Sequence, residues 1–538
     1  MKTKFIFVTG GTISGLGKGV TAASLGNLLK ANDYSVFVLK LDPYLNIDPG
    51  VMSPNEHGEV YVTEDGGETD LDLGHYERFI GVRLNKTSNF TSGKIYQRIL
   101  NKERNGDYEG KTVQVVPHVI DEIISIILDS AKATKPDFMI VEIGGTVGDI
   151  ESNPFIYALA KFFNLYRKNS MMFYVTFVPY LAATKEFKSK PTQVSINTLR
   201  TFGLNPDILL LRSQGELPKN MISKISSTTF VDQNKIISVP DQTNIYKIPL
   251  FLLEQNILSN IFNHFNLKES SNFHNNLQPW KNFINKIEQH KKALIKLALI
   301  GKYTELEDAY LSIIESLKIS SAHNEVSLKF DLINAENINQ KTCATVINGY
   351  DGVLILPGFG ARGFESKIMV SNFTRENKIP TLGICLGFQA MVVNQARLVG
   401  ITNANSAEFM RSKNDGVAVL DILEGKDKSK NLGGTLRLGS SDTKLLKDSI
   451  VHNIYKNEIV SERHRHRYEV SKKYVKLIQD NNFIFSGFSL KEELAETCEL
   501  KNHPFYVGVQ YHPEFNTTIL NSHKLFDAFM RKVIENKK

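Results

Sequence analysis

The stretch FIFVTGGTISGLGKGVT, residues 5–21, combines an apolar strand, a glycine-rich loop and the start of a helix. Glycines allow several backbone N–H groups to point at one anion, and the N-terminus of the following helix adds partial positive charge. Lys18 stands at the end of the loop, where a lysine can reach the outer phosphates of a nucleotide. The stretch therefore predicts a nucleotide-binding α/β domain that starts with a strand, a phosphate loop and a helix.

The loop differs from a regular Walker A motif in two ways. The spacing from Gly11 to Gly17 is one residue too long, and Gly19 stands where Ser or Thr would hold magnesium. Magnesium must therefore take hard oxygen ligands from elsewhere, and we predict Asp72 and Glu142 as those ligands. A tight turn of a dinucleotide-binding fold would explain the glycines but not Lys18. For Asp72, the alternative is a solvated acidic loop.

The length and composition exclude several classes of protein. A chain of 538 residues is too long for one core, and it lacks an apolar run long enough to span a bilayer. The first four residues lead into a strand without a cleavable signal pattern, so we expect a cytoplasmic protein that binds no membrane. Three widely spaced cysteines argue against disulfides or a zinc cluster. The net charge of +7 comes from scattered lysines, which favours small anionic substrates over nucleic acid.

A polar stretch divides the chain. Residues 268–292 are rich in Lys, Ser and Asn, and an apolar run of strand length follows at 294–300. We therefore predict an N-terminal domain over residues 1–267, a linker over 268–292 and a C-terminal α/β domain over 293–538.

The second domain contains a candidate nucleophile. Residues 379–390, IPTLGICLGFQA, read as strand, sharp turn and helix, and glycines lie two residues either side of Cys385. The helix N-terminus favours the thiolate, although a buried structural cysteine is the alternative. His512 and Glu514 lie two apart in an expected extended segment, so their side chains can meet, with Glu514 orienting His512 as a base.

The first domain closely resembles the synthetase domain of the CTP synthases. The resemblance rests on the glycine-rich loop, KLDPYLN at 40–46, the Asp72 segment and EIGGTVGDIES at 142–152, and it continues through KSKPTQ at 188–193, Lys224, VPD at 239–241 and IYKIP at 245–249. It implies two overlapping sets of nucleotide ligands. The ATP set is Ser14, Gly15, Leu16, Gly17, Lys18, Gly19, Lys40, Asp72 and Asp241. The UTP and CTP set is Ser14, Asp149, Ile150, Glu151, Lys188, Lys190, Gln193 and Lys224.

The second domain resembles the class I glutamine amidotransferases that CTP synthases carry at their C-terminus. Cys385, His512 and Glu514 match the catalytic triad, and the N–H groups of Gly358 and Leu386 match the oxyanion donors. Glu408 and Arg467 match the residues that hold the glutamine zwitterion. Without the resemblance, the Arg/His run around Arg467 would be interpreted as a solvated strand or a basic patch.

Two positions depart from the family pattern. Pro357 replaces the first of two glycines in the oxyanion loop, which stiffens the loop but leaves the Gly358 donor. Val194 stands where a histidine is common after Pro-Thr-Gln, so no role of that histidine transfers to this chain. The lysines and glutamine of 188–193, around a turn stiffened by proline, suit a triphosphate clamp, and a solvated lysine loop is the alternative.

Together the two resemblances imply a fold of two doubly wound α/β domains, a P-loop-like synthetase and a class I glutamine amidotransferase. They imply ATP-dependent amination of UTP to CTP with ammonia from glutamine, Mg²⁺ as cofactor, GTP as activator and CTP as feedback inhibitor. They also imply a homotetramer and place His57 and Val60 near an ammonia passage. The alternatives are another ATP-dependent amidoligase with a fused glutaminase, such as those acting on corrinoid carboxylates, and a nucleotide-switched binding protein with a degenerate glutaminase domain.

Overall fold

The computed structural model describes residues 2–289, 293–410, 415–422 and 436–537. The chain divides into two compact units, Met1–Pro49 with Asp72–Ile284, and Gly50–Leu71 with Asn285–Lys538. Residues 268–289 are mostly helical, as α11 (Phe273–Glu288), where the polar composition had indicated a connector. The end of the predicted linker, 290–292, lies outside the described residues, and the predicted domain limits stay predictions. None of the described helices combines the length and the apolar character needed to cross a bilayer.

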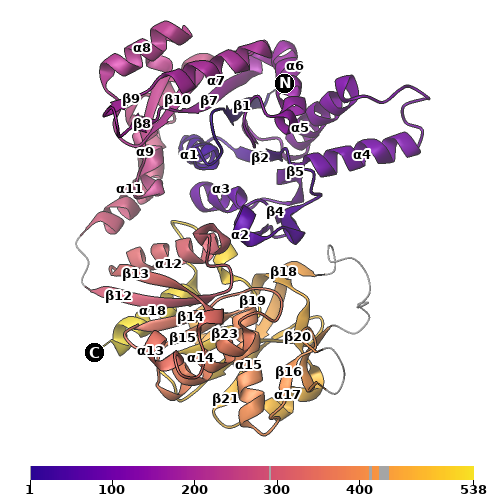
Figure 1. Cartoon of the computed structure of the whole chain (residues 1–538), viewed down its shortest axis with the longest axis vertical. Helices are drawn as coiled ribbons and strands as arrows, with labels where there is room; N and C mark the ends of the chain where they lie inside the picture. Colours follow the sequence, from indigo (N-terminus) through magenta and orange to yellow (C-terminus); the bar gives the residue numbers. More distant parts are fainter. Residues whose placement is uncertain (1, 290–292, 411–414, 423–435, 538) are drawn as a thin grey trace. The chain divides into compact units, whose positions relative to one another are not determined.

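The first unit is built on a seven-stranded sheet in which all neighbouring strands are parallel (Figure 1). Both faces of such a sheet are covered by helices, so its strands are continuously apolar, as Phe5–Val8 illustrates. The strand order is β11 (Ile236–Pro240), β10 (Ile208–Ser213), β7 (Ser170–Phe177), β1 (Lys4–Gly10), β6 (Phe138–Ile143), β2 (Val36–Asp42) and β5 (Asn89–Thr91).

Helices alternate with these strands along the chain. The longer ones of the first unit are α1 (Lys18–Ala31), α3 (Asp72–Ile80), α4 (Ser92–Arg104), α5 (Ile120–Thr134), α6 (Asn153–Tyr166), α7 (Lys190–Thr201), α8 (Lys219–Thr229), α9 (Ile248–Glu254) and α10 (Ile257–Phe265). A short hairpin of β8 (Tyr180–Leu181) and β9 (Glu186–Phe187) precedes α7. The expected turn at 188–193 is wrong in part, because α7 begins at Lys190 and Pro191 lies in its first turn, where proline is well tolerated.

The second unit contains a nine-stranded sheet whose first five strands are parallel and whose other pairings are antiparallel. Alternate residues of β12 enter different cores: Leu297 and Leu299 pack on one face, and Ala298 and Ile300 on the other. The strand order is β13 (Ser327–Asn334), β12 (Leu294–Gly301), β14 (Gly352–Ile355), β15 (Thr381–Ile384), β23 (Tyr506–Val509), β22 (Ala495–Leu500), β21 (Phe483–Ser489), β18 (Arg437–Leu445) and β19 (Ile459–His466).

The helices of the second unit pack on both faces of this sheet, as the two cores indicate. They are α12 (Leu311–His323), α13 (Cys343–Ile347), α14 (Phe364–Glu376), α15 (Leu386–Leu398), α16 (Ile450–Tyr455), α17 (Lys472–Ile478) and α18 (Lys524–Asn536). The short helix α2 (Pro54–His57) belongs to the same unit but contributes no residue to these cores. A small sheet contains β16 (Ala404–Ser406), β17 (Val417–Ile422) and β20 (Tyr468–Val470).

Residues 50–71 pack with the C-terminal unit although more than two hundred residues separate them in sequence. This segment includes the hairpin of β3 (Tyr61–Val62) and β4 (Glu68–Thr69). The buried Arg463 of β19 donates to Tyr61 Oη at 3.0 Å and to the Val62 carbonyl at 2.9 Å. Ser312 N–H donates to the Glu59 carboxylate at 2.8 Å. The segment is therefore tied to the second unit by buried polar contacts as well as by its strand pair.

Candidate active sites

The phosphate loop is shaped by glycine at two positions. Gly17 adopts φ 79° and ψ 33° directly before α1, a left-handed conformation that favours glycine. Gly19 lies against Asp72, and a Cβ on Gly19 would overlap the Asp72 carboxylate. The carboxylate therefore occupies the space that a Ser or Thr side chain would fill in a regular Walker A loop. This arrangement explains why residue 19 is a glycine, and it puts the predicted ligand Asp72 beside the loop.

A buried lysine lies among carboxylates at the carboxyl edge of the first sheet. Lys40 and Glu142 are paired neighbours on β2 and β6, and Lys40 Nζ lies 2.9 Å from Glu142 Oε1. Lys40 Nζ also contacts Asp72 and lies 3.8 Å from Asp42 Oδ1. The Tyr76 hydroxyl donates to the other oxygen of Glu142. The alternative of a solvated acidic loop for Asp72 is thus wrong, because Asp72 begins α3 and pairs with Lys40.

The electrostatics of this cluster suit a divalent cation. Burial, helped by the charge of Asp72, raises the pKa of Glu142 to about 6 even though Lys40 opposes the shift. Burial lowers the pKa of Lys18, whose Nζ donates to the Gly145 carbonyl at 2.7 Å. Asp72 and Glu142 offer hard oxygens that share one cationic neighbour, and their mutual repulsion would be relieved by added positive charge. The donor set therefore fits Mg²⁺.

The other residues predicted to bind nucleotides also lie in the first unit. Ser14 and Gly15 are exposed in the phosphate loop, and Asp149, Ile150 and Glu151 are exposed after β6. Lys188 precedes α7 and pairs with Glu186, and Gln193 Nε2 donates to Ser189 Oγ at 3.0 Å. Lys190 and Lys224 are exposed, and Asp241 accepts from Arg212 at 2.9 Å. Exposed lysines remain able to bind a triphosphate.

Cys385 sits at the turn between β15 and α15, as the sequence pattern predicted. Its backbone has φ 52° and ψ −102°, an uncommon conformation for a residue other than glycine, and its N–H donates to the Val509 carbonyl at 2.8 Å. Gln510 Nε2 lies 3.6 Å from Cys385 Sγ. The sharp turn places the sulfur at the N-terminus of α15, as the predicted nucleophile elbow requires.

His512 and Glu514 form a buried pair beside the cysteine. His512 Nδ1 lies 2.7 Å from Glu514 Oε1, although residues 513–516 form a 3₁₀ helix and the expected extended segment is wrong there. Burial alone would lower the pKa of His512, but the charges of Glu514 and Cys385 outweigh it and raise this pKa to about 10. The pair therefore favours an imidazolium at neutral pH.

A small cavity joins these groups to the segment 50–71. The cavity measures about 60 Å³ and is lined by Cys385, His512, Gly358 and Tyr310, and also by Val60. His57 lies three residues earlier, at the end of α2, and is exposed. A volume of this size admits a molecule such as water or ammonia, since one water takes about 30 Å³ of the liquid.

A larger cavity of about 510 Å³ contains the predicted glutamine residues. Glu408, Arg467 and Arg465 line it together with Tyr303, Phe359 and Gly50. Burial raises the pKa of Glu408, and the Gly360 N–H, Lys302 and Arg467 oppose that shift. Gly360 N–H donates to Glu408 Oε1 at 2.7 Å. The cavity thus offers an anionic and a cationic side chain, as an amino-acid zwitterion requires.

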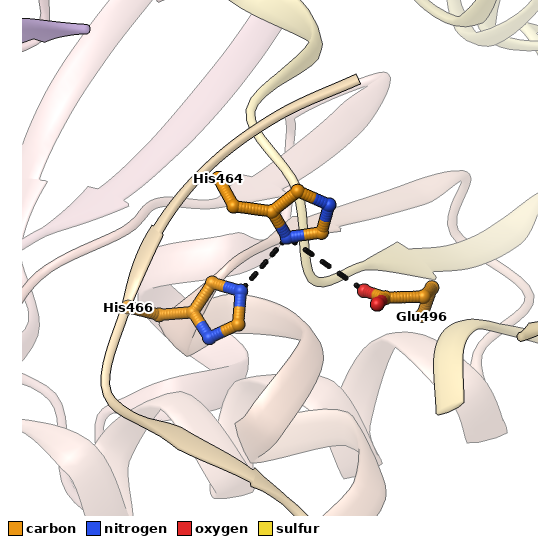
Figure 2. Close-up of side chains that lie close together, drawn as sticks. All are labelled: His464, His466 and Glu496. Atoms are coloured by element: carbon orange, nitrogen blue, oxygen red, sulfur yellow. Dashed lines mark hydrogen bonds and ion pairs between the residues drawn. The ribbon is translucent and has the colours of Figure 1, made fainter. Parts of the chain in front are cut away.

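The Arg/His run is a largely buried strand, so the alternative of a solvated one is wrong. Figure 2 shows His464 and His466 of β19 close to Glu496 of β22: His464 Nδ1 lies 2.8 Å from His466 Nε2 and 3.8 Å from Glu496 Oε2. These three side chains could ligate a metal. However, Arg437 already lies 2.5 Å from Glu496 and 3.3 Å from Glu469. We interpret the cluster as an ion-pair network that fixes the turn carrying Arg465 and Arg467.

Several polar residues around the second site were not predicted from the sequence. Burial lowers the pKa of Lys302 to about 8, and its Nζ donates to the carbonyls of Phe359 and Gly360. Arg465 donates to Glu68 at 2.9 Å and to the Gly50 carbonyl at 2.9 Å. The only sequence signal was the polar Gly301-Lys302-Tyr303 at the end of an apolar strand, which is typical of a ligand-binding edge.

Family models match both halves of the chain. Residues 4–267 match the model described as CTP synthase N-terminus, and residues 305–532 match glutamine amidotransferase class-I. The CTP synthase of Mycoplasmopsis pulmonis is 54% identical over 99% of this chain and 98% of its own length. That of Caldanaerobacter subterraneus is 45% identical over 99% of both chains. A solved glutaminase domain of Trypanosoma brucei CTPS with bound acivicin is 28% identical, with a TM-score of 0.42 over 45% of this chain and 95% of that one.

Replacement of Glu514 by Gln tests the electrostatics of the cysteine site. The amide removes a charge that raises the pKa of His512 to about 10, so the imidazolium beside the Cys385 sulfur becomes less stable at neutral pH. We expect alkylation of Cys385 by iodoacetamide at pH 7 to slow by about tenfold, since one pKa unit is a factor of ten. Peptide mapping by mass spectrometry measures this rate at Cys385 alone. The control Glu365→Gln, which alters an exposed carboxylate paired with Arg397, should leave it unchanged, and an equal rate in Glu514→Gln would contradict the assignment.

Proposed function

The chain belongs to the CTP synthase family and converts UTP to CTP with ATP through a synthetase domain and a glutamine amidotransferase domain, and we propose how its residues share this work. Membership excludes the other two functions considered from the sequence, a different amidoligase and a nucleotide-switched binding protein. The observation that carries the proposal is the convergence of Cys385, His512 and Gly358 on one cavity.

We propose that Cys385 attacks the amide carbonyl of glutamine. The N–H groups of Gly358 and Leu386 hold the oxyanion that forms, a role supported by the shared cavity of Gly358 and Cys385 and by the place of Leu386 directly after Cys385. The His512 imidazolium gives its proton to the departing nitrogen, which leaves as ammonia, and Glu514 keeps the ring oriented. Neutral His512 then takes a proton from water, which cleaves the thioester to glutamate. Glu408 holds the ammonium of glutamine and Arg467 its carboxylate, in the larger cavity.

Ammonia released at Cys385 then travels to the synthetase domain. Val60 lines the small cavity beside Cys385, which supports its proposed place on the route of ammonia. His57 is proposed on the same route because only two residues separate it from Val60. Free ammonia in solution would replace glutamine if it can reach the same acceptor.

In the synthetase domain, we propose that the γ-phosphoryl group of ATP passes to O4 of UTP and that ammonia displaces this phosphate. Residues 14–19 hold phosphates through backbone N–H groups, and Lys18 and Lys40 offset the charge of the transferred group. Lys188, Lys190, Gln193 and Lys224 bind the UTP triphosphate, residues 149–151 complete that site, and Asp241 lies by the adenine of ATP. Asp72 and Glu142 would hold Mg²⁺, which neutralises phosphate charge when bound.

Regulation and assembly are further parts of the proposal. CTP competes with UTP at the triphosphate residues, and GTP activates glutamine hydrolysis. We propose a cytoplasmic homotetramer. The large exposed apolar side chains of Ile150, Val194 and Phe230 support an interface on the first unit, since 82%, 52% and 85% of their surfaces are accessible in the single chain.

Cys385→Ala tests the division of labour. The variant lacks the thiolate that forms the glutamyl intermediate, so CTP formation from glutamine should fall by at least a thousandfold. CTP formation from added ammonia should stay within about twofold, because Lys18, Lys40, Asp72 and Glu142 are unchanged. It should rise with pH as more ammonium becomes ammonia. Loss of both activities in a folded variant would show that Cys385 is structural, and retention of both would show that the nucleophile is misassigned.

Lys190→Ala tests the triphosphate clamp. Loss of one charge-assisted contact typically costs about 1.5–3 kcal/mol, so the KM for UTP should rise at least tenfold. The KM for ATP should change by less than about twofold. Initial rates of ammonia-dependent synthesis measure both constants. Lys161→Ala, which removes an exposed lysine paired with Asp121, serves as the matched control. An equal rise in both KM values would refute the assignment of Lys190 to UTP.

Glu142→Gln tests the metal site. The amide is a weaker ligand than the carboxylate, so ammonia-dependent synthesis should fall by at least a hundredfold at ordinary Mg²⁺ concentrations. Binding of Mn²⁺ in the presence of ATP, measured by electron paramagnetic resonance, should weaken in parallel. Glu122→Gln changes another buried carboxylate of the same unit, paired with Lys102 and Arg98, and should alter neither. Normal Mn²⁺ binding by Glu142→Gln would remove Glu142 from the ligand set.

A further inference from the structure

The loop Leu356–Gly360 follows β14 and contains the proposed oxyanion donor Gly358. Side chains of the same unit donate hydrogen bonds to its carbonyl groups at four of five positions. Lys367 Nζ donates to the Leu356 carbonyl, and Tyr310 Oη donates to that of Pro357 at 3.3 Å. Lys302 Nζ donates to the carbonyls of Phe359 and Gly360. Only the Gly358 carbonyl has no such side-chain donor among the described residues.

Burial of these three donors costs desolvation free energy. Lys367 is fully buried and Lys302 is 2% exposed, and burial lowers the pKa of both ammonium groups. Tyr310 is 3% exposed, and its hydroxyl also accepts the Lys302 N–H at 3.0 Å. A buried lysine needs a strong reason to remain in an apolar environment, because desolvation of its charge is unfavourable. Here the lysines satisfy backbone carbonyls that would otherwise be buried without partners.

A hydrogen bond to the carbonyl of one residue also fixes the direction of the N–H group of the next residue. In a planar trans peptide, the C=O of one residue and the N–H of the next point in opposite directions. The peptide between Phe359 and Gly360 shows this: its C=O accepts from Lys302 and its N–H donates to Glu408. By the same rule, the contact of Tyr310 with the Pro357 C=O directs the Gly358 N–H away from Tyr310. Pro357 itself offers no N–H that could compete as a donor.

We propose that Tyr310 and Lys302 are positioning residues for glutamine hydrolysis, acting through the peptide planes of the oxyanion loop. Tyr310 sets the direction of the Gly358 N–H. Lys302 holds the Gly360 carbonyl, and the Gly360 N–H donates to Glu408. The oxyanion donor Gly358 and the side chain that binds the glutamine ammonium, Glu408, therefore stay fixed relative to each other. Lys367 anchors the start of the loop. This inference rests on the proposed roles of Cys385, Gly358 and Glu408.

Tyr310→Phe removes one hydroxyl and tests the direction of the Gly358 N–H. The kcat of glutamine hydrolysis should fall at least tenfold, because loss of one oxyanion donor costs about a hundredfold or more. The KM for glutamine should change by less than about threefold. Alkylation of Cys385 by iodoacetamide, a displacement that forms no oxyanion, should stay within twofold. Tyr506→Phe removes a buried hydroxyl bonded to Ser371 in the same unit and controls for general destabilisation. It should leave kcat unchanged.

Lys302→Met should give a different pattern, because Lys302 holds the carbonyl of Gly360, whose N–H donates to Glu408. We expect kcat to fall and the KM for glutamine to rise, each by about fivefold or more, while ammonia-dependent synthesis stays unchanged. A normal KM in Lys302→Met would overturn its link to Glu408.

A normal kcat in Tyr310→Phe, or an equal loss of hydrolysis and alkylation, would overturn the role of Tyr310. If Cys385→Ala is inactive with glutamine while Tyr310→Phe and Lys302→Met behave as wild type, this inference alone fails. If Cys385→Ala still hydrolyses glutamine, the proposed function of the cysteine fails first.

Discussion

The first unit depends on a buried cation that is held by carboxylates. Lys40 is 4% exposed and contacts Asp72 and Glu142, which come from a different strand and a different helix. A buried ammonium is stable only with such partners, since breaking one contact leaves an uncompensated charge. The pairing of β2 with β6, the start of α3 and the absence of a Cβ at Gly19 together bring these groups to one point. The same groups then provide the charge pattern that a nucleotide and its metal need.

In the second unit, too, buried charged groups have charged partners, and one such pair is the proposed catalytic pair. Its buried charges occur in sets: His512 with Glu514, and Arg437 with Glu469 and Glu496. Burial, and for Glu469 the charge of Glu496, raises the pKa of Glu469 to about 8 and that of Glu496 to about 7, with Arg437 opposing both shifts. Arg437 of β18 is the strand partner of His466, the residue between Arg465 and Arg467. Charged groups that line neither cavity therefore help to fix the backbone that carries the arginine predicted to bind glutamine.

The sequence allowed the prediction of features that depend on local pattern. The strand, glycine loop and helix at 5–21 and the turn at Cys385 follow from apolar runs and glycine spacing, and both are present. Glu408 and Arg467 could be proposed only through resemblance, because an isolated glutamate and a basic strand carry no pattern of their own. Lys302, Tyr310 and Arg463 could not be predicted, since their partners lie between tens and hundreds of residues away. Helix α7 replaced a predicted turn because Pro191 was interpreted as a turn residue and not as a helix start.

Residues 50–71 connect the unit that contains the proposed metal site covalently to the unit that contains the proposed glutamine site. The segment leaves the first unit after Pro49 and returns at Asp72, so the proposed metal ligand is the next residue after Leu71. Within the second unit, its Gly50 carbonyl and Glu68 hold Arg465, whose guanidinium lies 5.0 Å from the centre of the Phe359 ring in the oxyanion loop. Within the second unit, this segment is therefore connected through β4 and Arg465 to the loop that contains Gly358. Coupling free energy is reciprocal, so any effect of nucleotide on glutamine affinity would be matched by an equal effect of glutamine on nucleotide affinity.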